Sequence, residues 1–199
     1  EGVDFREALT MLAERAGIPL TYERKEERDL RARLLQAHGE ATKFFERNLA
    51  SYPDGLDYLK SRGVTAPTIR YFRLGYARGE WDALRLYLRH KGFSDAELEA
   101  SGLTKHEGER KPIDRFRSRI MFPLFDHSGR VVGFSGRYLK ERGGRDPAQE
   151  PPKYLNSPET SLYSKSKLLY GYDKAKSLIR KYNFSILVEG QMDLVMSHQ

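Results

Sequence analysis

The sequence has 199 residues, of which 39% are hydrophobic and 32% charged, so it can bury a core in one large domain or two small ones. It contains no cysteine, which excludes disulfides and cysteine-based zinc sites within these residues, and no apolar run approaches the roughly 18 residues of a membrane span. The net charge of +7 arises between Arg110 and Arg145, where ten basic residues meet three acidic ones. Such a local excess is typical of a phosphate-binding face, and a solvated basic loop is the alternative.

The first part of the sequence predicts two helices. Asp4 is a suitable N-cap and Gly17 a suitable C-cap, and the apolar residues between them recur at spacings of three and four. A second, longer helix is indicated by an apolar stripe at Leu30, Leu34, Ala37, Ala41, Phe44 and Leu49. We therefore expect residues 1–22 to form the tail of a preceding domain and a linker.

A series of short helices follows, each with a stop or start signal. The predicted helices are Leu56–Arg62, Pro67–Phe72, Trp81–Lys91 and one begun by the capping box Ser94–Glu97, with a short strand at Leu74–Ala77. The Trp81–Lys91 helix is amphipathic, and its inward face is predicted to carry Trp81, Leu84 and Leu88.

The pattern then changes to strands. Arg119–Phe125 and Arg130–Tyr138 are β-rich and predict a hairpin, and the polar stretch Lys140–Pro152 predicts a loop. Leu168–Tyr182 predicts a helix, and Ser185–Val188 predicts a buried strand that leads through Glu189-Gly190 into a further helix.

These elements predict an α+β fold in three parts. A helical N-terminal region is followed by a basic, β-rich part, and we expect residues 23–165 to form one N-terminal subdomain. Residues 166–199 then supply the first strand, turn and helix of an α/β domain that the sequence does not complete.

Three arginines alternate with other side chains between Asp114 and Pro123. If this stretch is one strand, Arg115, Arg117 and Arg119 share a face and present three planar donor groups to phosphates. The alternative is an edge strand whose arginines prevent aggregation or pair with Asp or Glu.

Two further stretches carry groups suited to nucleic acid. Gly133–Arg137 combines glycines, which allow close approach of a ligand or a strand, with an arginine at the strand end. The run that follows the predicted loop offers the cation of Lys153, the ring of Tyr154 and the amide of Asn156. By chemistry alone these stretches also fit a β-bulge and an ordinary surface loop.

A carboxylate stands where the last predicted strand ends. Glu189 there can bind Mg²⁺ or move a proton, and Asp193 follows about one helical turn later. Capping of the following helix is the alternative role for Glu189.

Six segments, taken in order along the chain, resemble the RNA polymerase domain of bacterial DnaG-type primases. They are Tyr58–Gly63, Phe72–Ala77 with Trp81-Asp82, Asp114–Pro123, Gly133–Arg137, Lys153–Thr160 and Val188–Asp193. The run Lys153–Thr160 is the most specific of them. Residues 1–21 resemble the helical end of the family's zinc-binding domain, whose cysteine-bearing part is not in this sequence.

The resemblance implies roles for particular residues. Those implied to bind template, nucleotide or primer are Arg62, Arg117, Arg119, Arg137, Lys153, Tyr154 and Asn156. Glu189 matches the catalytic first acidic residue of the Toprim fold, and Glu189 with Asp193 is implied to bind Mg²⁺ (or Mn²⁺). The remaining metal ligands are expected outside this chain, and zinc only in the preceding domain.

The implied activity is synthesis of RNA primers from ribonucleotides on a single-stranded DNA template. The resemblance also implies a cytoplasmic protein of the bacterial replisome, with no membrane contact and with a replicative helicase as partner through a C-terminal region absent from this chain. With an incomplete metal site, the chain alone is expected to bind single-stranded DNA weakly and to make no primers.

The sequence departs from the family pattern at three places. Gln191 replaces the usual tyrosine, Ser135 replaces the usual glycine, and the loop between Arg137 and Lys153 is longer than expected. Two other functions stay open: a non-catalytic module that only binds single-stranded DNA, and another Toprim protein such as a topoisomerase or nuclease. The latter class is expected to lack the Lys153–Thr160 run.

Overall fold

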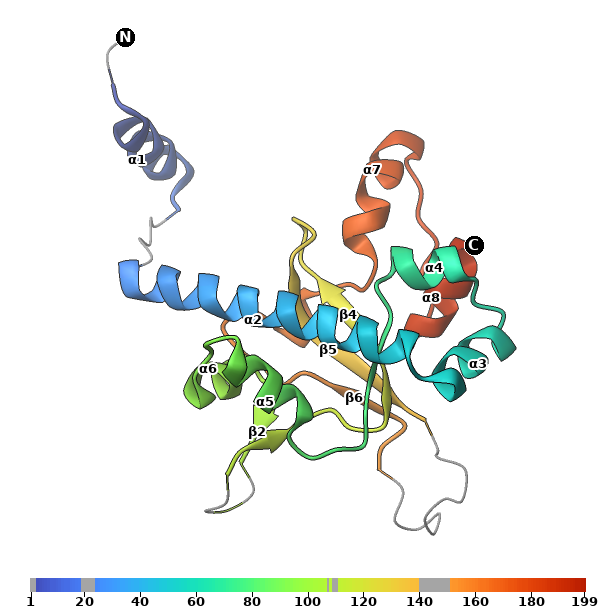
Figure 1. Ribbon diagram of the computed structural model, residues 1–199. Coiled ribbons are helices and arrows are strands. Elements are labelled where there is room, and N and C mark those ends of the chain that lie inside the picture. The colour runs from blue at the N-terminus through green and yellow to red at the C-terminus, as the bar shows by residue number, and fades with distance from the viewer. Residues whose placement is uncertain (1–2, 19–23, 107, 109–110, 140–150) are drawn as a thin grey trace. The chain divides into compact units, whose positions relative to one another are not determined.

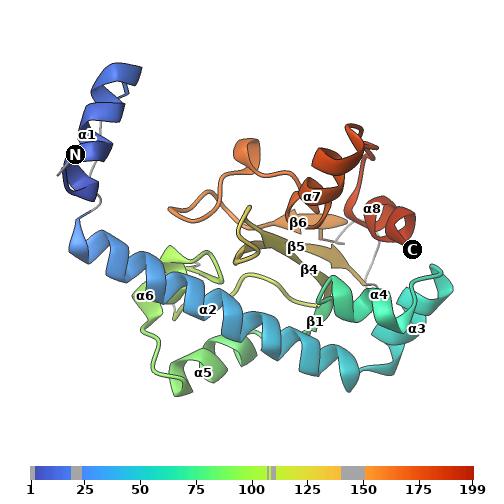
Figure 2. The same cartoon turned by 90° about the horizontal axis from the view of Figure 1, so that it is seen from above.

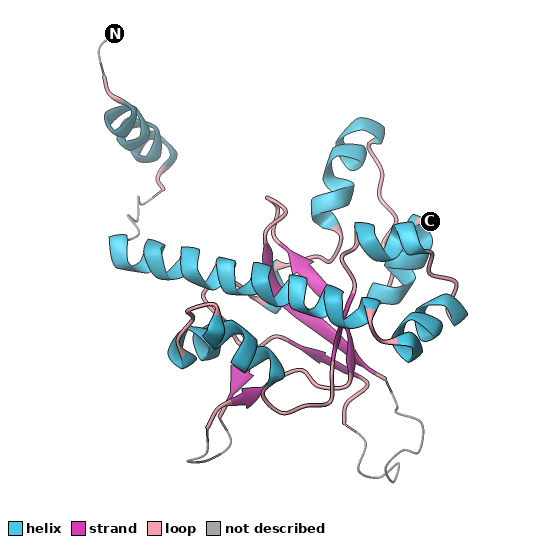
Figure 3. Ribbon diagram, viewed as in Figure 1, coloured by secondary structure: helices cyan, strands magenta, loops and turns pink. Residues whose placement is uncertain are grey.

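Helices come first along the chain and an antiparallel sheet follows them, which confirms the predicted α+β fold (Figure 3). The computed structural model describes residues 3–18, 24–106, 108, 111–139 and 151–199. It divides into two compact units, Glu1–Leu30 and Arg31–Gln199. The predicted domain boundary at residue 22 and most of the predicted loop, residues 140–150, lie outside the described residues.

The elements follow the predicted order closely (Figure 1). The helices are α1 (Phe5–Ala16), α2 (Lys25–Ala50), α3 (Pro53–Ser61), α4 (Ala66–Tyr71), α5 (Ala83–His90), α6 (Asp95–Ala100), α7 (Tyr172–Tyr182) and α8 (Gln191–His198). The strands are β1 (Gly75–Ala77), β2 (Thr104–Lys105), β3 (Ile113–Asp114), β4 (Arg119–Phe125), β5 (Val131–Tyr138) and β6 (Tyr154–Asn156).

Local capping chemistry sets several helix ends. The Asp4 carboxylate accepts the Glu7 amide at 2.9 Å, and Gly17 closes α1 with a φ of 65°. Ser94 and Glu97 form the reciprocal capping box that starts α6. Both N-caps and the C-cap were predicted from sequence, and the structure confirms them.

Four strands pair antiparallel in the order β1-β4-β5-β6, and β2 pairs with β3 separately. The β4–β5 hairpin confirms the prediction and pairs Arg119 with Tyr138 and Ile120 with Arg137. Because side chains alternate across a strand, Arg119 and Arg137 lie on opposite faces of the sheet.

Helix α2 covers the face of the sheet that carries Arg119, and both cartoon views show it crossing the strands (Figures 1 and 2). The ring centroids of Phe45 and Phe134 lie 5.3 Å apart in an edge-to-face contact. Gly75 of β1 allows this close packing, because a Cβ atom there would lie 2.5 Å from the Cβ of Phe45. The apolar stripe predicted for this helix therefore forms the core.

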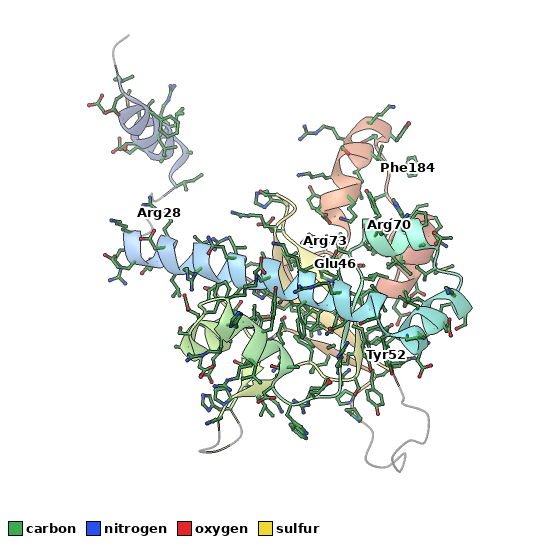
Figure 4. The ribbon with its side chains drawn as sticks, viewed as in Figure 1. Arg28, Glu46, Tyr52, Arg70, Arg73 and Phe184 are labelled. Carbon is green, nitrogen blue, oxygen red and sulfur yellow. The ribbon has the colours of Figure 1, made fainter. Side chains whose placement is uncertain are left out.

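The opposite face, which carries Ile120 and Phe122, is covered by α3, α4 and α8. The Arg73 guanidinium, just after α4, pairs with the Glu46 carboxylate of α2 through two hydrogen bonds of 2.9 and 2.8 Å (Figure 4). The Gln199 amide accepts the Thr65 N–H and donates to the Gly63 carbonyl, which joins the end of α8 to the start of α4.

Two predictions, one about burial and one about helix length, are wrong. Trp81 is 54% exposed rather than inward, because α5 begins two residues after it. Helix α7 begins at Tyr172 rather than Leu168, since Gly171 adopts a φ of 78° immediately before it.

The predicted buried strand Ser185–Val188 is also wrong, because this segment is neither a strand nor buried. Ile186 and Leu187 are 79% and 81% exposed, and Phe184 beside them is also exposed (Figure 4). Strand pairing needs a neighbouring strand, and none of the strands in the described residues lies in register with this segment. Among the described helices, none has the length and apolarity that a membrane crossing requires.

His38 is a fully buried titratable group in the middle of α2. Its ring packs 5.6 Å from that of Phe134, and its Nδ1 lies 3.1 Å from the Leu34 carbonyl oxygen. Burial lowers the pKa of His38 from 6.5 to about 4, although backbone hydrogen bonds with Leu34 and Ser101 act in the opposite direction.

This histidine makes stability depend on pH. The unfolded chain binds the proton below a pKa near 6.5 and the folded chain only near 4, so stability present above pH 6.5 is lost as the pH falls toward 4. The free energy of unfolding should fall by about 3 kcal/mol over this pH range, and His38→Gln should abolish this part of the pH dependence. Urea unfolding at several pH values measures the slope of the free energy of unfolding against pH for each variant. His90→Gln, at an exposed site, keeps the wild-type slope, and equal slopes for wild type and His38→Gln would contradict the prediction.

Candidate nucleic-acid interface

The centre of the candidate interface is Arg137 on β5. The Arg137 guanidinium donates to the Tyr154 hydroxyl at 2.6 Å, because β6 pairs with β5 so that these two residues face each other. Its guanidinium carbon lies 5.2 Å from the Tyr154 ring centroid and 5.6 Å from that of Tyr58 on α3. Two tyrosines thus fix the orientation of a partly exposed cation.

The neighbouring predicted site residues surround this cluster. Lys153 is exposed immediately before Tyr154, and Asn156, paired with Ser135, lies on the same face of the sheet as Arg137. Arg62 is exposed at the end of α3, one helical turn after Tyr58. Tyr154 and Asn156 therefore share a sheet face with Arg137, and Lys153 and Arg62 are exposed cations next in sequence or one turn away from the two tyrosines that contact it.

Arg117 forms a second exposed group with Trp81. The guanidinium carbon of Arg117 lies 4.1 Å from the indole centroid, and Arg117 also donates a hydrogen bond to the Asp114 carbonyl. An indole that is half exposed beside a fixed cation offers a stacking surface for a base and a positive charge for its phosphate.

The three alternating arginines do not form one face, so that prediction is wrong. Ser118 adopts a φ of 51°, which separates β3 from β4 and ends the period-two pattern. Arg119 is only 3% exposed and donates to the carbonyls of Gly136 and Pro152 at 2.9 Å. Arg115 instead donates to the Asn156 carbonyl at 3.2 and 3.0 Å.

The glycines of β5 confirm the predicted close approach, but the approaching groups belong to this chain. A Cβ at Gly136 would lie 2.9 Å from Cδ of Arg119, and one at Gly133 would lie 3.2 Å from Oγ of Ser157. Ser135 is fully buried between them. No ligand is needed to explain either glycine.

The second half of the Lys153–Thr160 run holds the chain together. The Ser157 N–H donates to the Phe134 carbonyl at 2.8 Å, and the Phe134 N–H donates to Oγ of Ser157 at 2.9 Å. The serine hydroxyl thereby replaces a backbone acceptor where the ladder ends. Pro158 packs on Gly102, and the Thr160 hydroxyl accepts the Leu162 and Tyr163 amides.

Asp114 has a structural role that the sequence did not reveal. Its buried carboxylate accepts the amides of Leu84 and Arg85 at 2.8 and 2.9 Å, and so caps α5 from a different element. Burial raises the pKa of Asp114 to about 7, against the effect of the two amide hydrogen bonds. Asp114 is 30 residues from Leu84 in the sequence, so no local sequence pattern predicts this helix cap.

Glu189 and Asp193 flank the start of α8, and both are exposed. Oδ2 of Asp193 accepts the Gly190 amide at 3.1 Å, so the capping role considered for Glu189 belongs to Asp193. Carboxylate oxygens suit Mg²⁺, and these two residues would hold it. Within the described residues no group of three or more His, Cys, Asp or Glu side chains is arranged to hold a metal ion.

Comparison with known proteins identifies related chains along nearly the whole sequence. Residues 44–176 match the family model of the DNA primase catalytic core, N-terminal domain. A DNA primase of Streptomyces coelicolor is 44% identical over 98% of this chain and 30% of its own length. One of Deinococcus radiodurans is 42% identical over 100% of this chain and 33% of its own length. The chain therefore spans about a third of the length of these relatives.

Solved structures show the same fold. The RNA polymerase domain of Mycobacterium tuberculosis primase DnaG, in complex with a double-stranded DNA oligomer with a 6-nucleotide overhang, is 38% identical and superposes with a TM-score of 0.77. That match covers 84% of this chain and 51% of the other. A DnaG primase catalytic domain bound to single-stranded DNA is 34% identical, with a TM-score of 0.70 over 84% of this chain and 50% of the other.

Replacement of Ser157 tests the structural half of the run. Ser157→Ala leaves the Phe134 N–H without its hydroxyl acceptor, and we expect a loss of about 1–3 kcal/mol in the free energy of unfolding. Ser157→Thr keeps the hydroxyl and should lose less, while Ser177→Ala, at an exposed site on α7, should change little. Denaturant unfolding measures all three. Wild-type stability for Ser157→Ala would show that this hydrogen bond contributes nothing.

Proposed function

The chain belongs to the DnaG-type DNA primase family, as the N-terminal part of the catalytic core, and from this we propose that it supplies the surface on which a primase holds single-stranded DNA and an incoming ribonucleotide. The observation that carries the proposal is the grouping of Arg137, Tyr154 and Asn156 on one face of the sheet edge, with the exposed Lys153 immediately before Tyr154. A cation can bind the phosphate of a nucleotide, an aromatic ring can stack on its base, and an amide can form hydrogen bonds with its base or sugar.

The ribonucleotide is assigned to the Arg137 cluster. Arg137 and Lys153 would bind phosphate oxygens, the first with an oriented guanidinium and the second as a flexible point charge. Asn156 can both donate to and accept from a base or a ribose. Arg62, one turn beyond Tyr58, adds a further exposed cation at the same side of α3.

The template strand is assigned to the stack of Trp81 and Arg117. A base can stack on the exposed indole while the guanidinium binds the adjacent phosphate, which gives sequence-tolerant binding. The likeness to a DnaG catalytic domain bound to single-stranded DNA supports this choice of ligand.

The catalytic step is assigned to Glu189, with Asp193 as a second ligand of Mg²⁺ or Mn²⁺. A bound metal ion would stabilise the attacking and leaving oxygens of phosphoryl transfer. We further propose that the exposed segment 185–188 is a strand of a Toprim sheet completed by parts of the primase that this chain does not span. RNA primer synthesis in the bacterial cytoplasm, with a helicase as partner, would belong to that whole protein.

Charge reversal tests the two binding surfaces. Arg117→Glu and Lys153→Glu should each weaken binding of a labelled single-stranded oligonucleotide by about tenfold at low salt, because each removes a phosphate contact. Each should also lower the slope of log affinity against log salt by about 0.7. Fluorescence anisotropy at several salt concentrations measures both quantities.

Arg180→Glu, at an exposed site on α7, makes the same change in net charge away from these surfaces. Its affinity should stay within about twofold of wild type. If Arg117→Glu and Lys153→Glu behave like this control, the proposed interface is wrong.

The chain alone should make no primers. Only Glu189 and Asp193 are available to the metal in our assignment, and Asp193 already accepts a helix amide. Incubation with template, Mg²⁺ and labelled ribonucleotides, followed by gel electrophoresis, is the measurement. Template-dependent RNA products that vanish in the Glu189→Gln variant would overturn the assignment.

A further inference from the structure

Arg115 and Arg119 reach the two ends of the segment that carries Lys153, Tyr154 and Asn156. Arg119 donates from Nη1 to the carbonyl of Pro152, the residue before Lys153, and to the carbonyl of Gly136 on β5. Arg115 donates from Nε and Nη2 to the carbonyl of Asn156, at the other end. Both guanidiniums therefore bind main-chain oxygens on either side of the candidate binding residues.

The Asn156 carbonyl needs a partner other than a strand, because β6 is an edge strand. In the order β1-β4-β5-β6, only one side of β6 is paired. The Tyr138 N–H donates to Lys153 O and the Ser157 N–H to Phe134 O, and these are the bonds directed toward β5. Because carbonyls alternate along a strand, that of Asn156 points to the open side, where Arg115 binds it.

Arg119 also fastens β6 to the rest of the sheet. The Arg119 side chain packs against Gly136, where a Cβ atom would lie 2.9 Å from Cδ of Arg119. A single guanidinium nitrogen, Nη1, donates to both the Gly136 carbonyl on β5 and the Pro152 carbonyl. Lysine carries the same charge, but its flexible ammonium does not hold its donors in the fixed plane of a guanidinium, so we expect it to hold this bridge less firmly.

We propose that Arg115 and Arg119 are positioning residues, which clamp the two ends of Lys153–Asn156 and so present Lys153, Tyr154 and Asn156 to nucleic acid as one fixed group beside Arg137. The inference rests on the proposed function of that segment. It differs from the binding of template, nucleotide or primer that the family resemblance implies for Arg119, because this residue is buried and its guanidinium donates to main-chain carbonyls.

The clamp predicts a non-additive effect on binding. Arg119→Lys and Arg115→Lys keep the charge but loosen the segment, so each should weaken single-stranded DNA binding by about fivefold to tenfold. In a Lys153→Ala/Tyr154→Ala background two of the three clamped side chains are gone, and the same lysine substitutions should add less than about twofold. Arg130→Lys, on the exposed β4–β5 turn, is the matched control and should change nothing in either background.

A second measurement needs no nucleic acid. Amide hydrogen exchange of β6 should be about tenfold faster in Arg119→Lys and Arg115→Lys than in wild type and in Arg130→Lys, with the exchange of α2 unchanged. The α2 amides report global stability, so they separate loosening of the segment from general unfolding. If Arg119→Lys does not fold, Arg115→Lys decides the question alone.

The outcomes separate the clamp from the proposed function. Equal loss of affinity in both backgrounds, or unchanged exchange of β6, overturns the clamp. Wild-type protein that shows no salt-dependent binding overturns the proposed function, and the exchange measurement then decides the clamp by itself. Non-additive binding together with faster exchange supports both.

Discussion

The candidate interface depends on one constraint, the antiparallel register of β4 and β5. Pairing of Ile120 with Arg137 places Arg137 on the face opposite to Arg119, and pairing of Arg137 with Tyr154 places β6 beside it. A shift of one residue would exchange the faces of every side chain on the strand. Helix α2 covers one face and α3, α4 and α8 cover part of the other, so the uncovered remainder, at the edge strand, becomes the accessible surface.

Local signals in the sequence were sufficient for most elements of the fold. The capping residues of α1 and α6 and the hairpin turn act within a few residues of one another, so their patterns are visible in the chain itself. Tertiary effects were not visible. The left-handed conformation of Ser118 breaks an apparently regular strand, and the Asp114 carboxylate caps a helix that lies 30 residues away.

The candidate site was predicted in composition but not in arrangement. Arg137, Tyr154 and Asn156 share a face of the sheet, while Trp81 is exposed and stacked with Arg117 rather than buried as predicted. The helical spacing of Trp81, Leu84 and Leu88 predicted that all three side chains are buried. Helix α5 begins only at Ala83, so Trp81 lies before it and the helical spacing does not apply to it. The family resemblance implies which residues bind nucleic acid, and the structure separates those that are exposed from those, such as Arg119, that bind main-chain carbonyls.

The pairing of β6 with β5 has a consequence for the order in which the protein assembles. Residues 139–153 separate the two strands, whereas the β4–β5 turn is a few residues long, so joining β6 closes a much larger loop at a higher entropic cost. Strand β6 should therefore pair with β5 after the β4–β5 hairpin has formed, and it should open more readily than that hairpin. The surface that we assign to nucleotide exists only while β6 is paired. A nucleotide bound there would favour the paired state of β6, so binding would also stabilise this edge of the sheet.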